Sequence, residues 1–201
     1  MEHRRVVARR RMVRRYLPDP IAPAALARIA RAALHGPRAG QAEGISVVVV
    51  TDPGQRAALA RLGAEHKWKA RGHAPWLSPA PAHLVICVDP TAYRRRYAEP
   101  DKDPAALTVP WWWVDAGAAL NLVLLAAVDE DLAAGFLGAH ALPGLAEALG
   151  LPPGVLPLGV VTVGHRHPKE APTRRRERPP EADMLHDGAW GRPFPGRDPG
   201  R

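Results

Sequence analysis

The apolar run across residues 114–130 restricts the fold of this chain more than any other feature. Its hydrophobic side chains fall on nearly every side of a helix, so both sides need cover from other parts of the protein. The most apolar part, residues 116–128, contains Asn121 and is too short to cross a bilayer. We therefore predict a buried central helix around which the remaining elements are arranged.

Two further kinds of element are indicated around that helix. Residues 23–35 carry apolar side chains at helical spacing, with Pro23 in the first turn and Gly36 after the last, which predicts another helix. Residues 45–50 and 83–88 are apolar runs typical of strands buried on both faces. Weaker patterns predict a helix over 55–67, a short strand over 134–138, a short helix over 143–149 and a long strand over 158–164.

Helices that alternate with a few buried strands predict an α+β fold, with a mixed β-sheet flanked by helices and an extended C-terminal tail. The length of 201 residues and the 46% of hydrophobic residues fit one domain over 1–201 with a substantial core. Residues 1–22 form an N-terminal arm in this interpretation. Residues 165–201 have too little apolar content to fold alone, so we expect this tail to dock on another surface.

The charge and the single cysteine bound the classes of function. The formal net charge is +8, and its clustered arginines attract phosphate, although such clusters are also typical of a solvated basic face or a nucleic-acid patch. Cys87 is the only cysteine, so neither an intramolecular disulfide nor a cysteine metal site can form. Residues 1–16 lack the apolar core of a secretory signal. We expect a protein of the reducing cytoplasm, without a membrane partner.

The sequence carries no motif typical of a hydrolytic, metal or dinucleotide site. His165 and His167 lie two residues apart with no carboxylate or cysteine beside them, which is poor evidence for a metal. No H-E-x-x-H, G-x-S-x-G, P-loop or G-x-G-x-x-G pattern occurs. We therefore expect no metal ion.

Residues 91–110 are predicted to form a long charged loop, of a length that is usually functional or mobile.

Three segments together carry a recognisable pattern. The first runs Arg9-Arg10-Arg11-Met12-Val13-Arg14-Arg15-Tyr16, the second Pro37-Arg38-Ala39-Gly40-Gln41-Ala42-Glu43, and the third Arg174-Arg175-Arg176-Glu177-Arg178-Pro179-Pro180. In order and spacing they resemble the nitroreductase family of FMN enzymes, whose pattern is roughly RRSxRxF, then P-S-A-G-N-x-Q, then a near-terminal R-x-P-L. The residues themselves match less closely than the spacing does.

The resemblance implies a set of cofactor-binding residues. The arm supplies the FMN phosphate site through Arg10, Arg11, Met12 and Arg14, with Met12 in place of the usual serine. The late Arg178 corresponds to an arginine that closes over the same phosphate, and Arg176 is its neighbouring candidate. The family loop that packs against the flavin ring of the partner's site corresponds to Pro37, Arg38, Ala39, Gln41 and Glu43.

The departures in that loop matter for the pose of the flavin ring. A carboxylate at Glu43 accepts a hydrogen bond from flavin N3–H but lacks the donor of a glutamine amide. Leu137, Gly138 and Ala139 occupy the place where family members present backbone N–H groups to the flavin. Tyr97, Trp111, Trp112 and Trp113 are candidates for an aromatic wall of the substrate pocket, and three adjacent tryptophans cannot all face one core.

The function implied is that of an FMN-dependent oxidoreductase. NAD(P)H or another hydride donor reduces the flavin and leaves, and a small electron-poor acceptor is then reduced at the same face in a ping-pong cycle. The protein is expected to be a homodimer with flavin sites at its interface. Two alternatives stay open: a degenerate member that stores flavin or binds a deazaflavin without turnover, and a basic nucleic-acid-binding protein. The second is less favoured, because stacking aromatics are not interleaved with the arginines.

Overall fold

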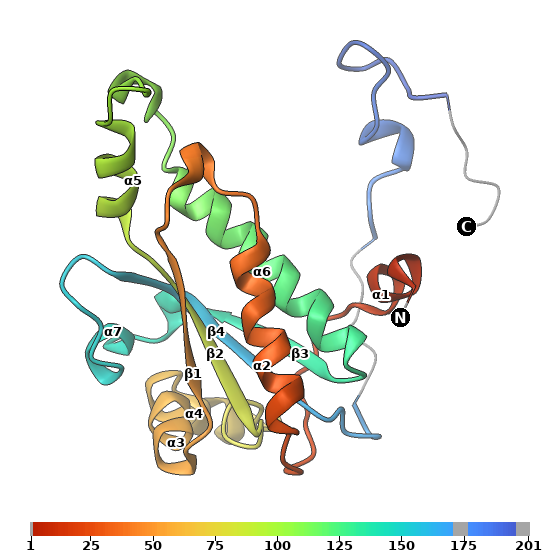
Figure 1. Cartoon of the computed structure of the whole chain (residues 1–201). Coiled ribbons are helices and arrows are strands. Elements are labelled where there is room, and N and C mark those ends of the chain that lie inside the picture. Colours follow the sequence, from red (N-terminus) through yellow and green to blue (C-terminus); the bar gives the residue numbers. More distant parts are fainter. Residues whose placement is uncertain (1, 171–176, 196–201) are drawn as a thin grey trace. The chain divides into compact units, whose positions relative to one another are not determined.

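The structure is a computed structural model, and it describes residues 2–170 and 177–195 (Figure 1). The chain divides into two compact units, Met1–Glu170 and Ala171–Arg201. The helices of the first unit are α1 (His3–Arg9), α2 (Pro23–Ala32), α3 (Pro53–Leu62), α4 (Glu65–Ala70), α5 (Pro90–Tyr97), α6 (Trp111–Asp129) and α7 (Leu145–Ala148). Its strands are β1 (Ile45–Val50), β2 (Ala82–Val88), β3 (Ala133–Gly138) and β4 (Leu156–Gly164).

The four strands form one sheet in the order β1-β2-β4-β3. Neighbouring strands pair antiparallel, and the parallel component is an isolated bridge between Met12 and Ala134. The two central strands carry the core, and every residue of β2 is buried. The predicted α+β class is confirmed by this sheet and its helices.

Helices cover both faces of the sheet. On one face, α2 and α6 pack against alternate residues of the central strands, including Leu84, Ile86 and Val161 (Figure 1). On the other face, α3 and α7 meet the intervening residues, among them Val85 and Val160. This alternation follows from the period of two along a strand, which sends successive side chains to opposite faces.

The predicted central helix is confirmed, but only one of its sides is covered by other elements. α6 begins three residues earlier than predicted, at Trp111, and Ala116, Ala119, Val123 and Ala127 are buried on the sheet. Its other side is left open by the part of the chain that the structure describes, since Val114 is 51% exposed and a Cβ at Gly117 would have no neighbour within 4 Å. By length and composition α6 is apolar enough to cross a membrane, and in this fold it serves as the core helix.

Three other predictions need correction. The helix predicted over 55–67 is two helices, α3 and α4, because Gly63 ends the first and Ala64 adopts a left-handed φ of 49°. β1 is not buried on both faces, because it lies at the edge of the sheet and Val49 is 44% exposed. The predicted loop over 91–110 contains α5, whose first amide is capped by Asp89, followed by a single 3₁₀ turn at Pro104–Ala106.

The second unit is described from residue 177 to residue 195. It contains a 3₁₀ turn, Glu181–Asp183, and an antiparallel bridge between His186 and Pro193. Apolar side chains stay exposed on it, and Trp190 is 90% exposed. Little of its apolar surface is therefore buried within the unit itself.

Candidate functional site

The N-terminal arm is fixed to the sheet by its backbone. Val13 N–H donates to the carbonyl of Ala134 at 2.9 Å, beside the bridge formed by Met12. Further along, the hydroxyl of Tyr16 donates to the carbonyl of Val13 at 2.7 Å and lies 2.8 Å from Oγ1 of Thr162. Burial raises the pKa of Tyr16 well above its usual value, so the hydroxyl stays protonated. The arm therefore presents its arginines from a fixed main chain.

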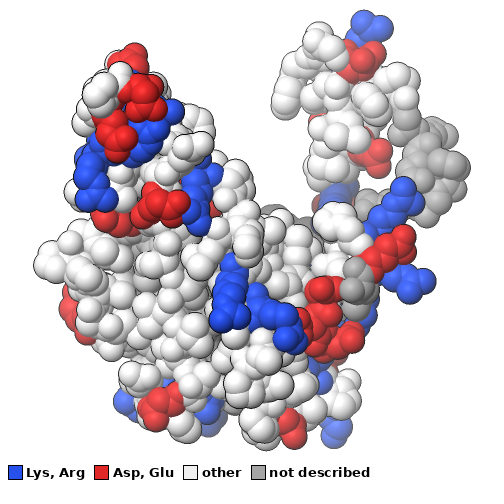
Figure 2. Space-filling view, viewed as in Figure 1, with Lys and Arg blue, Asp and Glu red and all other residues white. Residues whose placement is uncertain are grey.

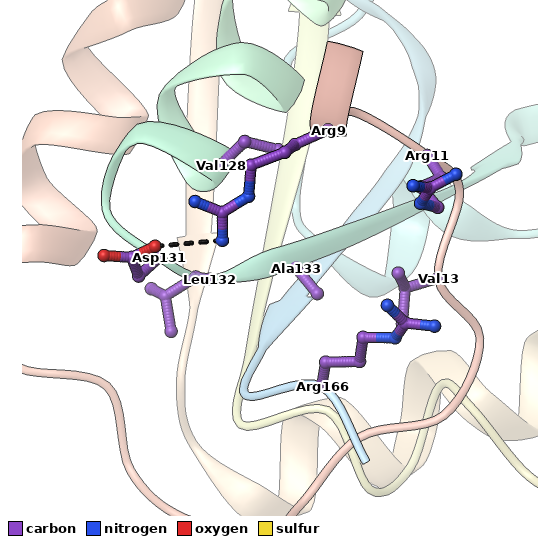
Figure 3. Close-up of a pocket in the computed structure, with 8 residues that line it drawn as sticks. All are labelled: Arg9, Arg11, Val13, Val128, Asp131, Leu132, Ala133 and Arg166. Atoms are coloured by element: carbon purple, nitrogen blue, oxygen red, sulfur yellow. Dashed lines mark hydrogen bonds and ion pairs between the residues drawn. The ribbon is translucent and has the colours of Figure 1, made fainter. Parts of the chain in front are cut away.

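A pocket of about 160 Å³ opens between this arm, the end of α6 and the start of β3 (Figure 3). Its charged lining is Arg9, Arg11, Asp131 and Arg166, and its apolar lining is Val13, Val128, Leu132 and Ala133. Arg9 donates to Oδ1 of Asp131 at 3.1 Å, which offsets the one carboxylate in the lining. Among the described residues, Arg11 and Arg166 have no ion-pair partner. The pocket thus offers two uncommitted guanidinium groups to an anion.

The arginines predicted for the phosphate site take different positions. Arg11 lines the pocket, whereas Arg10 is the residue directly after α1 and Arg14 is not part of the lining. The Arg14 guanidinium lies 5.6 Å from the ring centre of Trp76, and its amide donates to Oε1 of Glu170 at 3.0 Å. Arg178 lies in the second unit, and Arg176 lies outside the described residues.

Arg9 and Arg166 were not predicted as site residues. Arg166 follows β4, and Tyr16 pairs with it in an isolated antiparallel bridge. That bridge brings together residues separated by 150 positions in the sequence, for which local spacing holds no signal. Arg9 is the first residue of the arginine segment in the arm, but it lies one residue before the part that matches the family pattern.

The loop of residues 37–43 lies at the opposite end of α6. Ala39 N–H donates to Oδ2 of Asp115 at 2.9 Å, and the hydroxyl of Tyr93 donates to the same oxygen at 2.7 Å. Asp115 is only 4% exposed. Its partners are 76 and 22 residues away, so only the fold shows the group.

Inside this loop, Arg38 engages two groups. Its guanidinium pairs with the carboxylate of Glu43 and donates to the carbonyl of Leu34 at 2.6 Å. The Glu43 carboxylate that was expected to meet the flavin ring is therefore paired with Arg38 here. Gly40 and Gln41 follow with left-handed φ angles of 63° and 61°, which turn the chain sharply.

The predicted backbone donors lie where β3 ends. Gly138 pairs with Gly159 of β4, and Ala139 begins a 3₁₀ turn. A side chain at Gly138 would lie 2.7 Å from Nδ1 of His140, so His140 covers this glycine closely. Leu137 packs against the cluster that contains Val13 and Trp76, which links the strand end to the arm.

The aromatic candidates separate by exposure. Trp112 is partly buried, with its ring edge-on to Tyr93 and the Arg94 guanidinium 5.5 Å from its centre. Trp113 is 36% exposed and Tyr97 lies against Gly40.

The described residues contain no group of three or more His, Cys, Asp or Glu placed to hold a metal ion.

Comparison with known proteins gives a consistent result. Residues 7–165 match the model of the nitroreductase family. The curated protein FMN reductase [NAD(P)H] of Bacillus subtilis (strain 168) is 28% identical over 191 residues, which span 90% of this chain and 71% of that protein. The hypothetical oxidoreductase YcnD of Bacillus subtilis superposes with a TM-score of 0.73 at 26% identity, over 94% of this chain and 75% of that one. NADPH:FMN oxidoreductase from Vibrio harveyi complexed with NAD+ gives 0.70 at 22% identity, over 94% and 77%.

Proposed function

This chain belongs to the nitroreductase family and is a flavin-dependent oxidoreductase with FMN as its cofactor, and we propose that NAD(P)H reduces it and a small electron-poor acceptor reoxidises it. The observation that carries the proposal is the pair of uncommitted arginines, Arg11 and Arg166, beside the N-terminal arm. Guanidinium groups bind phosphate oxygens through charge-assisted hydrogen bonds. Their pocket is concave and already has its own carboxylate, Asp131, paired to Arg9.

The residues present fit the phosphate end of FMN. Arg11 and Arg166 supply the donors, while Val13, Val128 and Leu132 form apolar walls that limit water around the anion. Met12 lacks the hydroxyl that the family pattern has at this place, and one lost hydrogen bond costs about 1–3 kcal/mol of binding free energy. We expect weaker phosphate binding from that departure, not its loss.

When bound, FMN would supply the hydride chemistry that links oxidation of NAD(P)H to reduction of the acceptor. The contribution of the chain is to hold and shield the cofactor. The arm orients the phosphate, the end of β3 at Leu137 and Gly138 offers main-chain groups to the ring, and Trp113 and Tyr97 are the candidates for the wall of the acceptor site. No acid–base pair is required of the protein.

A homodimer is part of the proposal. The arginine pocket touches Val128 and the loop touches Asp115, and the helical rise of about 1.5 Å per residue separates these positions by roughly 20 Å along α6. One subunit's loop and pocket are therefore poorly placed to serve the same flavin. The open side of α6, with Val114 and Gly117, is an apolar surface suited to a second copy. We expect two flavin sites, each built from both subunits, in a cytoplasmic protein.

The test is FMN binding by the purified chain. The wild type should take up FMN with one flavin per subunit and show the visible absorbance of bound oxidised flavin. Arg11→Ala and Arg166→Ala should each weaken binding about ten- to hundredfold. Arg4→Ala, which removes an exposed arginine of α1 outside the pocket lining, is the charge-matched control and should bind as the wild type does. Equal losses in all three variants would refute the site.

The flavin-storing alternative is favoured by one observation, the pairing of Glu43 with Arg38 in the loop expected at the flavin ring. A protein of that kind binds FMN without being reduced by NAD(P)H. Addition of NADH or NADPH under anaerobic conditions separates the two functions, since the proposed oxidoreductase loses its visible flavin absorbance and the storage protein keeps it.

Binding to nucleic acid is less well supported. On the face shown in Figure 2, Lys and Arg side chains stand in small groups interspersed with Asp and Glu, without a continuous basic stripe. Tight binding of random oligonucleotide that falls steeply with salt, together with no uptake of FMN, would reverse this ranking.

A further inference from the structure

Asp115 is a buried carboxylate that forms no ion pair with any residue of the described structure. It is 4% exposed and lies near the start of α6. A buried charge is costly unless hydrogen bonds replace the lost water. Here Oδ2 accepts two such bonds, from Ala39 N–H at 2.9 Å and from the hydroxyl of Tyr93 at 2.7 Å. The carboxylate thus joins three segments: α6, α5 and the loop of residues 37–43.

Tyr93 contacts the far end of the same loop with its ring. The residue is fully buried, and a side chain at Gly44 would lie 2.5 Å from Cε2 of Tyr93. The carbonyl of Gly44 accepts from Asp89 N–H at 2.8 Å, at the start of α5. Burial, together with the hydrogen bond to Asp115 and its negative charge, raises the pKa of Tyr93, so its hydroxyl remains a donor.

A second tyrosine of α5 reaches the middle of the loop. Tyr97 lies one helical turn beyond Tyr93, on the same side of α5. A side chain at Gly40 would lie 2.9 Å from Cε2 of Tyr97, and the φ of 63° at Gly40 also favours glycine. The two tyrosines therefore set how closely the loop approaches α5.

The hydrogen bond from Ala39 to Asp115 differs from the others in the loop, because it reaches a distant segment of the chain. The other hydrogen bonds given for residues 37–43 in the described structure stay local: Arg38 with Leu34 and Glu43, Gln41 with Arg38, and Ala42 with Ala39. A loop held mainly by its own contacts keeps its shape but not its position. Asp115 and the tyrosine rings join the loop to α6 and α5, in addition to the packing of Ala42, which is 1% exposed.

We propose that Asp115 and Tyr93 are positioning residues which hold the Ala39 peptide and so place the loop of residues 37–43 against the flavin. This inference rests on the proposed function, because it takes that loop as the one that contacts the flavin ring. Neither side chain needs to touch the cofactor. Their effect passes through the main chain of Ala39, with Gly40 and Gln41 following it directly.

Hydrogen exchange in the flavin-free protein tests the clamp itself. Asp115→Ala leaves the Ala39 amide and the Tyr93 hydroxyl unpaired, and exchange of the amides at 39–42 should accelerate about ten- to hundredfold. Asp115→Asn retains an acceptor oxygen and should stay within a few fold of the wild type. Tyr93→Phe removes only the hydroxyl and should fall between them. Leu145→Ala truncates a buried side chain in a different cluster and serves as the control for general destabilisation.

FMN binding tests the role toward the flavin. The dissociation constant, followed by quenching of flavin fluorescence, should rise about tenfold in Asp115→Ala, rise less in Tyr93→Phe, and stay near the wild-type value in Asp115→Asn and Leu145→Ala. The wavelength of the visible flavin band should shift in the same order, because a displaced loop changes the surroundings of the ring. A structural role alone would lower the melting temperature without moving the band.

The outcomes are distinguishable. Unchanged exchange at 39–42 in both Asp115→Ala and Tyr93→Phe overturns the clamp. Accelerated exchange with unchanged FMN affinity and band position overturns the positioning role while the proposed function stands. A wild-type protein that takes up no FMN overturns the proposed function and the flavin part of this inference together. If Asp115→Ala does not fold, Tyr93→Phe carries the same comparison, since only one oxygen atom is removed.

Discussion

The two ends of α6 handle charge in opposite ways. At its C-terminal end, Arg11 and Arg166 stand in an open pocket without ion-pair partners among the described residues. At its N-terminal end, Asp115 is buried and accepts hydrogen bonds from two other segments. Unpaired charge in a pocket is available to a ligand, whereas a buried charge that accepts hydrogen bonds from other segments fixes the chain. The contrast separates a part of the fold that receives a ligand from a part that holds a loop.

The largest expected effect comes from emptying the pocket of its arginines. In the double variant Arg11→Ala/Arg166→Ala, FMN affinity should fall at least about a hundredfold, because each charge-assisted bond contributes about 1.5–3 kcal/mol. The free energy of unfolding of the flavin-free protein should hardly change. Titration with FMN and urea unfolding measure the two quantities. A large loss of stability would show that the arginines are structural and would break the comparison.

Removal of the Asp115 carboxylate at the N-terminal end of α6 should mainly lower the stability of the flavin-free protein. Asp115→Ala should lower the free energy of unfolding by about 2–3 kcal/mol, because a buried amide and a buried hydroxyl lose their acceptor. Urea unfolding without flavin provides the measurement, and Asp115→Asn is the control that keeps an acceptor. If Asp115→Ala is as stable as the wild type, the carboxylate is not part of the framework.

Acid conditions should weaken the framework at His83, a buried residue of β2. Burial lowers the pKa of His83 from 6.5 to about 4, while Nε2 lies 2.8 Å from the carbonyl of Leu77. The unfolded chain binds the proton more readily, so this stability is complete above pH 6.5 and is lost as the pH falls toward 4. Between pH 7 and pH 5 the loss should be about 2 kcal/mol. His83→Asn should flatten the dependence of urea midpoints on pH over this range.

The smallest effect on stability and FMN binding is expected from substitution of Asp131, the carboxylate in the pocket lining. The pair of Arg9 and Asp131 is exposed, at 54% and 75% of the two side chains, and such pairs contribute between zero and about 1 kcal/mol. Asp131→Asn should therefore leave the urea midpoint nearly unchanged. It should strengthen FMN binding a few fold, because one negative charge near the phosphate is removed. Weaker binding would mean that Asp131 orients Arg9 toward the ligand.

Local patterns predicted most of the framework. The helix that became α2 was recognisable from its spacing, from Pro23 and from Gly36, and its bounds were close to those observed. α5 was missed because residues 91–110 were interpreted as a long charged loop. Asp89 and Pro90 begin the helix, with Asp89 capping the amide of Thr91 and Pro90 in the first turn.

The site was predicted less completely, because its contacts span long stretches of sequence. Arg11 was identified from the arm motif and lines the pocket, but Arg166 became its neighbour only through the pairing of the arm with the residue after β4. Asp115 likewise has no local signal, since Ala39 and Tyr93 approach it only in the folded chain. The assignments of Arg10, Arg14 and Arg178 remain predictions that FMN binding will test.

The bridge between Met12 and Ala134 has a consequence for the solubility of the protein. β3 is an outer strand, and an outer strand with free main-chain groups is a template for pairing with other molecules. The arm covers part of that edge with its own backbone, through Met12 and Val13. A chain shortened to begin after Tyr16 would thus lose more than its phosphate-binding arginines. It would expose the edge of β3 to pairing with other molecules. Selection on cofactor binding and selection against self-association therefore act on the same few residues of the arm.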